Sequence, residues 1–267
     1  MIKLMRKANY NTFKDANLFF SLRDVFGVGD IIEVVRQSDI TVQKFKAYQI
    51  TNGDLVNFCN GSEGRVSWWK EQTGSGNDAV QTDNAKRPII VDSNGNLITE
   101  NGKPSILATG SQNLIALNLP FSNTDNISVY TVGKYSNTNS NAKYIYNITT
   151  SGPTSSDNFI ANRSFNNDFN SLINNSTGFK INTITPSDIN FNLFVDKLKN
   201  GNLIKKVNTT QNIVTGYSQF SPTKLYLFSA KSNGGFHEGK ISEFIVYKQQ
   251  DAPTDIETEL NNYYNIY

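Results

Sequence analysis

Residues 68–81, with the sequence WWKEQTGSGNDAVQ, gather side chains that often do chemistry: two tryptophans, a glutamate, an aspartate and a glycine-rich turn. A phosphate-binding loop needs its glycines between a strand and a helix, followed by Lys and then Ser or Thr. This segment has neither that lysine nor a helical pattern after it. We therefore exclude a phosphate loop and expect a strand over residues 66–70 that ends in a tight turn.

The two tryptophans should face opposite sides of that strand, because successive side chains of a strand alternate. One should pack in the core, and the other should face outward or lie under a loop. Core packing is the stronger expectation for the pair, and the outward ring is a candidate for stacking on a sugar. Our candidate carbohydrate-binding residues are Trp69, Tyr217, Phe220 and His237, with further aromatic and Asn side chains expected from residues 150–190 and 215–220.

The carboxylates scattered along the chain are candidates for the acid–base chemistry of glycoside hydrolysis. That reaction needs two carboxyl groups about 5–10 Å apart. The candidates are Glu63, Glu71, Asp78, Glu238 and Glu243. Glu243 lies inside an alternating strand pattern and is expected to face solvent. His237 is the single histidine, so no Ser–His–Asp or metal constellation is available, and we expect it to form a local hydrogen bond. No catalytic residue is assigned.

No metal or cofactor is predicted either. Residues 92–96, DSNGN, superficially resemble a calcium loop but lack the bidentate glutamate that should follow. A hairpin turn explains this stretch completely.

Composition excludes several classes of function. Charged residues make up 18% of the 267-residue chain, below the typical value of about 25%, and Asn, Ser, Thr and Gly take their place. The net charge is +2 without a basic stripe, which argues against nucleic-acid binding. There is no apolar run of about eighteen residues and no secretory signal, so we expect no membrane insertion. The single Cys59 cannot form an internal disulfide and fits assembly in a reducing compartment.

Strand patterns dominate the chain. They cover residues 30–38, 126–135, 142–150, 223–230 and 239–249, and we pair 126–135 with 142–150. Residues 87–104 and 190–208 are two hairpins, each with an Asn-Gly pair that favours a type I′ turn. Residues 150–190 are expected to be rich in loops. Helical spacing occurs at residues 251–267, and a helical turn is expected at the start of residues 11–27.

These elements predict an all-β protein, one antiparallel β-sandwich of about a dozen strands with a short C-terminal helix. The chain is long enough to bury a large core without disulfides or a metal. We assign residues 13–267 to this single domain and residues 1–12 to an N-terminal arm, a candidate anchor to a larger particle.

Three segments carry a resemblance to a known family. They are LFFSLRDVFGVGDIIEVVRQSD (18–39), GDLVNFCNGSEGRVSWWKEQTGSGNDAVQTDNAKRPIIV (53–91) and NGKPSILATGSQNLIAL (101–117). In order and landmarks they are similar to the catalytic-domain family of fungal and bacterial α-L-arabinofuranosidase B. The same pattern recurs in fibre, spike and capsid-associated proteins of bacteriophages. The C-terminal residues 236–267 resemble the closing strand and helix of laminin-G-type sandwiches. The resemblance implies a concanavalin-like jelly roll.

The departures from that family are as informative as the matches. In the hydrolases, the counterpart of Cys59 pairs with a second cysteine, and Gly64 occupies that position here. The hydrolases also have a vicinal cysteine pair under the sugar pocket, which this chain lacks. Their acid/base aspartate corresponds to Ala230, which cannot transfer a proton, and losing this group alone removes a factor of about 10²–10⁴ in rate. The resemblance therefore implies a retained scaffold without its chemistry.

The resulting hypothesis is a non-enzymatic bacteriophage virion structural protein, a head- or tail-attached fibre, spike or decoration subunit that is assembled in the host cytoplasm. Its expected partners are other virion proteins, further copies of itself, with a trimer suited to a fibre, and a host-surface glycan. The alternative is an active glycoside hydrolase of the α-L-arabinofuranosidase type.

Overall fold

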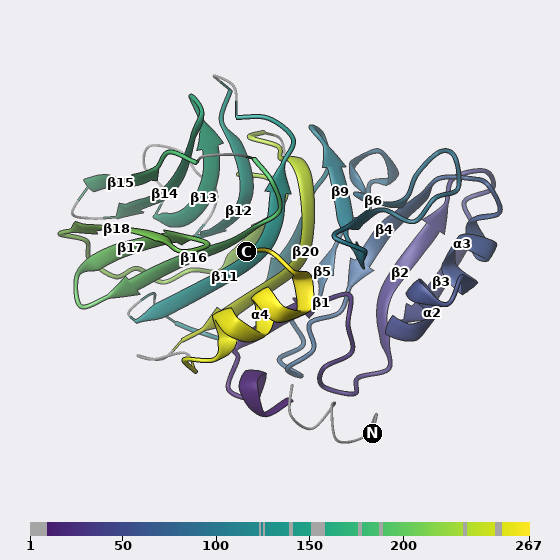
Figure 1. Cartoon of the computed structure of the whole chain (residues 1–267), viewed down its shortest axis with the longest axis horizontal. Helices are drawn as coiled ribbons and strands as arrows, with labels where there is room; N and C mark the ends of the chain where they lie inside the picture. The colour runs from purple at the N-terminus through teal and green to yellow at the C-terminus, as the bar shows by residue number, and fades with distance from the viewer. Residues whose placement is uncertain are drawn as a thin grey trace.

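The computed structural model describes residues 10–122, 124, 126–138, 141–150, 158–175, 178–186, 189–231, 234–248 and 253–267. Two antiparallel sheets face each other across a hydrophobic core (Figure 1). The first sheet has the strand order β10, β19, β12, β13, β14, β15. Its strands are β10 (Leu114–Leu117), β19 (Lys224–Leu227), β12 (Lys143–Thr149), β13 (Phe159–Phe165), β14 (Asp168–Asn175) and β15 (Gly178–Ile184).

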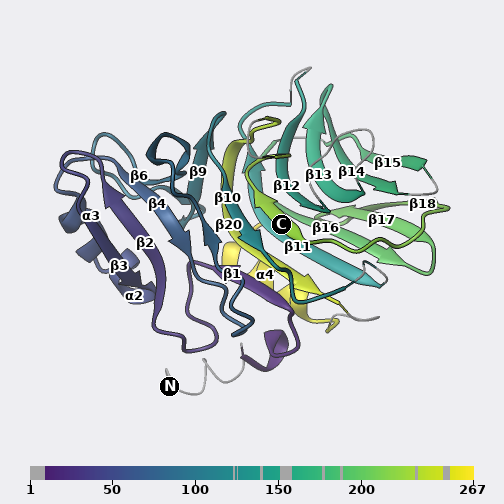
Figure 2. The same ribbon diagram turned by 180° about the vertical axis from the view of Figure 1, so that it is seen from behind.

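The second sheet has the order β1, β20, β11, β16, β17, β18. Its strands are β1 (Leu18–Ser21), β20 (Glu238–Tyr247), β11 (Ile127–Tyr135), β16 (Asn192–Lys199), β17 (Asn202–Val207) and β18 (Thr210–Thr215). Seen from behind in Figure 2, β10 and the strands around β12 lie in front of β20 and β11, which shows the two layers.

The N-terminal strands close one end of the sandwich. Strand β4 (Gly64–Trp69) pairs with β5 (Ala79–Val80), which pairs with β10 of the first sheet. The same β4 also pairs with β6 (Ile89–Val91), which reaches β20 of the second sheet through β9 (Ile106–Thr109). At the opposite end, the side-chain amide of Asn182 on β15 donates to two carbonyls of the second sheet, those of Leu203 and Asn212.

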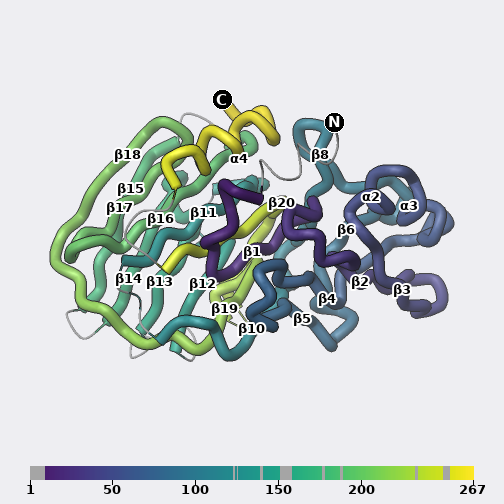
Figure 3. Tube along the Cα trace, turned by 90° about the horizontal axis from the view of Figure 1, so that it is seen from below, coloured from purple at the N-terminus to yellow at the C-terminus, as the bar shows by residue number. Residues whose placement is uncertain are grey.

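The remaining elements lie on this frame. Strand β2 (Asp30–Arg36) pairs with β4 and with β3 (Val42–Lys46). The short helices α2 (Ala47–Thr51) and α3 (Asp54–Cys59), the 3-10 turn η1 (Asn84–Lys86) and the hairpin of β7 (Thr99–Glu100) and β8 (Lys103–Pro104) complete the N-terminal part. Helix α4 (Ile256–Tyr264) covers the outer face of the second sheet beside β16 and β11 (Figure 3).

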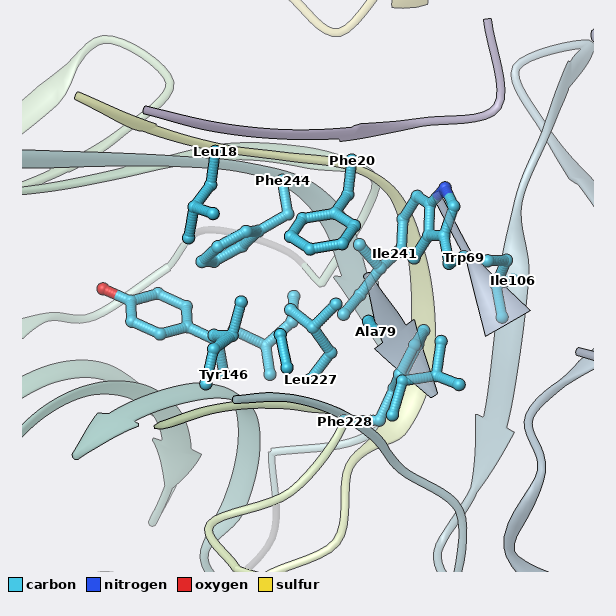
Figure 4. Close-up of a cluster of buried hydrophobic side chains, with 14 of the residues drawn as sticks. Leu18, Phe20, Trp69, Ala79, Ile106, Tyr146, Leu227, Phe228, Ile241 and Phe244 are labelled. Carbon is cyan, nitrogen blue, oxygen red and sulfur yellow. The ribbon is translucent and has the colours of Figure 1, made fainter. Parts of the chain in front are cut away.

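Aromatic rings fill the space between the sheets (Figure 4). Tyr146 of the first sheet meets Phe244 of the second with ring centroids 5.3 Å apart, and Phe20 lies 5.7 Å from Trp69. Large aromatic side chains supply much of the buried apolar area of a core. The structure confirms the all-β class and the terminal helix. In that helix Ile256, Leu260 and Tyr264 are buried at the predicted spacing.

Two predicted features of the middle of the chain are wrong. Strand β11 does not pair with β12 but with β16 and β20, so the two neighbours in sequence lie in opposite sheets. Residues 150–190 are not mainly loop, because β13, β14 and β15 run through them. Their many Asn and Ser side chains suggested loops, but Asn162, Ser171 and Asn182 are fully buried inside the sheets.

Of the two predicted Asn-Gly turns, at Asn94-Gly95 and Asn200-Gly201, the second is confirmed. Asn200 and Gly201 both have positive φ, as a type I′ turn between β16 and β17 requires. In residues 92–96 only Gly95 has positive φ, and the Asp92 carboxylate accepts the N–H groups of Asn94 and Asn96 instead. Within the described ranges, no helix is both long and apolar enough to cross a membrane.

Candidate functional site

The segment 68–81 is a structural network rather than an open site. The Glu71 carboxylate is fully buried and accepts hydrogen bonds from the backbone of Phe19, from both the backbone and hydroxyl of Thr73, and from both the backbone and hydroxyl of Ser75, at 2.6–3.0 Å. The Asp78 carboxylate in turn accepts the backbone N–H of Glu71. Glu71 thus fixes the turn to β1, and both of its carboxylate oxygens accept hydrogen bonds from the fold itself.

The two tryptophans do face opposite sides of β4, but the outward ring is Trp68. Trp69 is 0% exposed and donates its indole N–H to the carbonyl of Ser21. The Trp68 ring is partly exposed, with the Lys44 ammonium 4.8 Å from its centroid. The prediction that Trp69 stacks on a sugar is therefore wrong for this structure. The register between β2 and β4 shifts between Trp68 and Val66, so Val66 and Ser67 are both buried and the alternation that follows turns Trp69 inward.

Glu243 is also internal. Its carboxylate pairs with Arg23 at 2.9 Å and accepts the Tyr264 hydroxyl at 2.7 Å. Burial alone lowers the pKa of Arg23, but the charge and hydrogen bond of Glu243 together with the neighbouring Tyr264 and Tyr263 outweigh it, and the net pKa is raised. The expectation that Glu243 faces solvent is wrong. A buried arginine and glutamate pair here because an unpaired charge could not remain inside.

The other aromatic candidates lie mostly inside the fold. Phe220 is 6% exposed and belongs to the main core, and Tyr217 packs against that core while partly buried. His237 is fully buried against Tyr135, at a centroid distance of 4.8 Å. Its Nε2 meets the carbonyl of Lys134 at 3.0 Å, which confirms the expected local hydrogen bond. Burial lowers the pKa of His237 to about 3, so Phe220 and His237 offer no surface to a sugar here.

The outer face of the first sheet carries a different set of polar residues. The pairing register places Tyr226, Asn147, Ala161 and Leu172 in one row across β19, β12, β13 and β14. The next row has Tyr144 opposite Arg163, and Arg163 opposite Asn170. Because side chains two apart share a face, Arg163 lies on the same face as Ala161.

The segment that follows β19 folds over this face. Phe228 has a φ of 65°, which is uncommon for a non-glycine residue and turns the chain out of the sheet. The backbone N–H of Tyr144 then donates to the carbonyl of Gly235, and the Asn147 amide donates to the carbonyl of Ala230 at 2.6 Å. A Cβ on Gly235 would lie 2.6 Å from that of Ala230, so the loop fits closely only with glycine there.

Three buried polar atoms at this junction have no hydrogen-bond partner among the described residues: Asn147 Oδ1, Arg163 Nε and Ser229 Oγ. We call Asn147, Arg163, Ser229 and Tyr144 the outer-face cluster. Arg163 donates through Nη1 to the Tyr144 hydroxyl at 3.1 Å, and its guanidinium lies over the Phe165 ring. Buried polar groups are nearly always satisfied, so atoms such as these point to water or a ligand.

Glu238 is the first residue of β20, three positions after Gly235. It pairs with Lys143 and also accepts the side-chain amide of Asn137. The hydrogen bond from Lys143 lowers the pKa of Glu238, so it is ionised at neutral pH and is a poor general acid. Ala230 supplies no proton. Within the described part of the chain, no group of three or more His, Cys, Asp and Glu could hold a metal ion.

Two surface hollows lie elsewhere. One, of about 270 Å³, is lined mainly by Asn and Thr side chains and by Tyr267. The other, of about 190 Å³, lies between α2 and α4 beside Tyr48 and Tyr263. Their polar and aromatic linings could also receive a sugar ring.

Solved structures share this arrangement of sheets. A GH54 α-L-arabinofuranosidase soaked with a cyclic sulfate inhibitor superposes over 96% of this chain with a TM-score of 0.65 at 14% sequence identity. An arabinofuranosidase complexed with arabinofuranosyl-α-1,2-xylobiose gives 0.65 at 13% identity, also over 96% of this chain. The chain has the fold of GH54 arabinofuranosidase. It spans 64% of the length of those chains, and at such identities the likeness concerns the fold alone.

A more distant likeness is to the Trypanosoma rangeli sialidase in complex with the inhibitor DANA. The TM-score is 0.51 at 8% identity, over 72% of this chain and 30% of that one. No protein-family model and no curated protein matches the sequence.

The position of Gly64 agrees with the resemblance drawn from the sequence. A Cβ on Gly64 would lie 2.6 Å from the Cys59 sulfur, where a second cysteine could form the short disulfide loop of the hydrolases. Without that partner, Cys59 is a free buried thiol whose pKa is raised to about 11 by burial. Sequence reasoning missed Asn147, Arg163 and Ser229, because each is polar in a strand pattern that shows no motif.

Proposed function

We propose that the protein binds carbohydrate without hydrolysing it, and that the outer-face cluster is the binding site. The observation that carries this proposal is a set of buried atoms that lack a hydrogen-bond partner among the described residues: Asn147 Oδ1, Arg163 Nε and Ser229 Oγ. Together they hold an acceptor, a donor and a hydroxyl, the groups that sugar hydroxyls pair with. Because these atoms are buried, we propose that a sugar reaches them by displacing the chain that follows β19. The shared fold with arabinofuranosidases, one of them complexed with arabinofuranosyl-α-1,2-xylobiose, supports this direction.

We propose that the protein does not hydrolyse the sugar because its described residues lack the pair of carboxyl groups that this reaction needs. A glycosidase needs an acid with a raised pKa facing a second carboxylate. Here Glu238 has a lowered pKa and is held by Lys143, while the sequence resemblance aligns Ala230 with the acid/base of the arabinofuranosidases. Glu71 and Glu243 are fully occupied inside the fold.

A virion is the setting that we propose for this binding. The sequence resemblance to phage fibre, spike and capsid-associated proteins supports it, together with an uncharged surface rich in Asn, Ser and Thr. The arm of residues 1–12 is our candidate anchor, and residues 1–9 lie outside the described residues. Copurification with intact particles at a fixed copy number, lost on deletion of residues 1–12, is the expected result. Normal incorporation of the deletion variant would contradict the anchor.

The test of binding presents the intact protein to a glycan array and follows each hit by titration calorimetry. We expect a Kd of about 1 mM or tighter, and a loss of about tenfold in Ser229→Ala and Asn147→Ala. Thr209→Ala and Tyr48→Ala, in the two hollows, are the matched controls and should leave the Kd unchanged. Absence of any glycan binding, or a loss confined to the control variants, contradicts the proposal.

The alternative, an active arabinofuranosidase, has its own test. Hydrolysis of an aryl α-L-arabinofuranoside should be undetectable above a heat-denatured sample. Turnover that disappears in Glu238→Gln but persists in Glu71→Gln would establish catalysis at the loop and overturn the non-enzymatic assignment.

A further inference from the structure

A second polar cluster lies between the two sheets, away from the outer-face cluster. Asp196 of β16 and Lys205 of β17 are paired across neighbouring strands, and their side chains are 1% and 0% exposed. Lys205 Nζ lies 3.5 Å from Asp196 Oδ1. Lysine and aspartate are almost never fully buried unless they are paired, and even a buried pair is often less stable than neutral groups in its place.

The two groups are unequally solvated by the protein. Asp196 Oδ2 accepts the Tyr146 hydroxyl at 2.7 Å and the Asn162 amide at 2.9 Å, and Oδ1 accepts the Ser171 hydroxyl. Lys205 has two acceptors within reach among the described residues, Ser171 Oγ at 3.2 Å and Asp196 Oδ1. An ammonium group has three N–H donors, and a partly satisfied buried charge is costly.

We infer that Lys205 and Asp196 join in an isopeptide bond that the folded protein forms by itself. The amide product is neutral. Its formation therefore removes the free-energy cost of keeping two desolvated charges inside the protein. The facing strands hold the amine and the carboxyl group together, and intramolecular reactions of this kind gain effective concentrations of about 10⁵–10⁸ M.

The atoms balance without any co-reactant. The ammonium transfers one proton to Asp196 Oδ1, and the neutral Lys205 amine attacks Cγ to form the C–N bond. A second proton passes from Nζ to Oδ1, the Cγ–Oδ1 bond breaks, and one water leaves. Oδ2 becomes the amide oxygen.

Each neighbour has a defined part in that step. Tyr146 and Asn162 both donate to Oδ2, where negative charge develops during attack, as donors in an oxyanion hole do. Ser171 lies between Nζ and Oδ1, so its hydroxyl can relay the protons. Burial lowers the pKa of Lys205, against the opposing effect of Asp196, and this favours the nucleophilic neutral amine.

The test is the mass of the intact folded protein. We expect it to be about 18 Da below the sequence mass, the loss of one water, and a tryptic digest should show the peptides around Asp196 and Lys205 joined. Lys205→Arg should restore the full sequence mass, because guanidinium stays protonated. Lys206→Arg is the matched control and should keep the bond, since Lys206 pairs with Glu257 nearer the surface.

Asp196→Asn gives an independent check, because an amide can lose ammonia, about 17 Da, and form the same product. Its mature mass should equal that of the wild type. A wild-type mass equal to the sequence mass, with tryptic cleavage after Lys205, overturns the inference. A mass loss that the digest maps to another residue overturns it equally, and neither result requires that a variant fold.

Discussion

The turn at residues 68–81 and the outer-face cluster both hold buried polar side chains, but they differ in how their polar atoms are satisfied. At the turn, Glu71 accepts five hydrogen bonds from Phe19, Thr73 and Ser75. In the outer-face cluster, Asn147 and Ser229 keep buried oxygens without a partner among the described residues.

This difference separates scaffold from site better than residue type does. Glu71 resembles a catalytic residue in sequence, yet every oxygen is used to hold the chain. Ser229 belongs to no motif, yet its hydroxyl has no structural use that the fold displays. A buried polar group that lowers the stability of the fold is a candidate for function, because active and binding sites often lower the stability of the protein that holds them. Measurements on the turn and on the outer-face cluster can test this difference.

The largest effect should come from the turn. Glu71→Ala leaves three backbone N–H groups without their acceptor, so the free energy of unfolding should fall by about 3–4 kcal/mol. Chemical denaturation measures it. Glu63→Ala is the control, since its partly exposed pair with Arg65 contributes less than about 1 kcal/mol. Equal losses in both variants would mean that the buried network has no special weight.

The next effect is a pH dependence from His237, below the loop of the outer-face cluster. Its pKa is about 3 in the folded protein and about 6.5 when unfolded, so the unfolded state binds the proton more tightly. The stability is therefore present above pH 6.5 and is lost as the pH falls towards 3. Lowering the pH from 7 to 4 should cost about 3 kcal/mol from this group.

Denaturation of the wild type and His237→Gln at both pH values isolates that contribution. The wild type should lose more stability than the variant on acidification. Parallel losses would show that His237 titrates normally and is not sealed in the fold.

On the scaffold side, Gly64 offers a paired test. Gly64→Cys should form a disulfide with Cys59 under mild oxidation, and for so short a loop the oxidised variant should be about 2 kcal/mol more stable than the same variant when reduced. Gly64→Ala should destabilise the protein by about 1–3 kcal/mol relative to the wild type, because its Cβ would press on the Cys59 sulfur. Unfolding with and without reductant measures both, and two free thiols after oxidation would contradict the geometry.

The smallest effect on stability should come from Ser229. Ser229→Ala removes a buried hydroxyl without a partner, so the free energy of unfolding should stay the same or rise by up to about 1 kcal/mol. A loss above about 1 kcal/mol would show that the hydroxyl has a structural partner, and the contrast with Glu71 would disappear.

Local patterns were sufficient for much of the fold. The helix at 256–264 follows from apolar spacing, and the hairpin of β16 and β17 follows from Asn200-Gly201. Sheet membership could not be predicted, because the pairing of β11 with β16 and β20 joins residues far apart in sequence. The strands β13 and β14 were missed because their buried faces include Asn162 and Ser171, which propensity assigns to turns.

The site was harder to predict for the same physical reason. Alternation predicted that Trp68 and Trp69 face apart, but not which one faces inward, and a shift by one residue exchanges the faces. The outer-face cluster depends on register across β19, β12 and β13 and on the turn at Phe228, neither of which a single sequence reveals.

Carbohydrate binding at the outer-face cluster is tested most directly by a crystal structure of the protein soaked with the glycan that binds best on the array. We expect a sugar on the outer face of the first sheet, with its hydroxyls within hydrogen-bond distance of Asn147 Oδ1, Arg163 Nε and Ser229 Oγ. A sugar bound instead in the hollow beside Tyr267 or the one beside Tyr48, with the outer-face cluster unchanged, would contradict it.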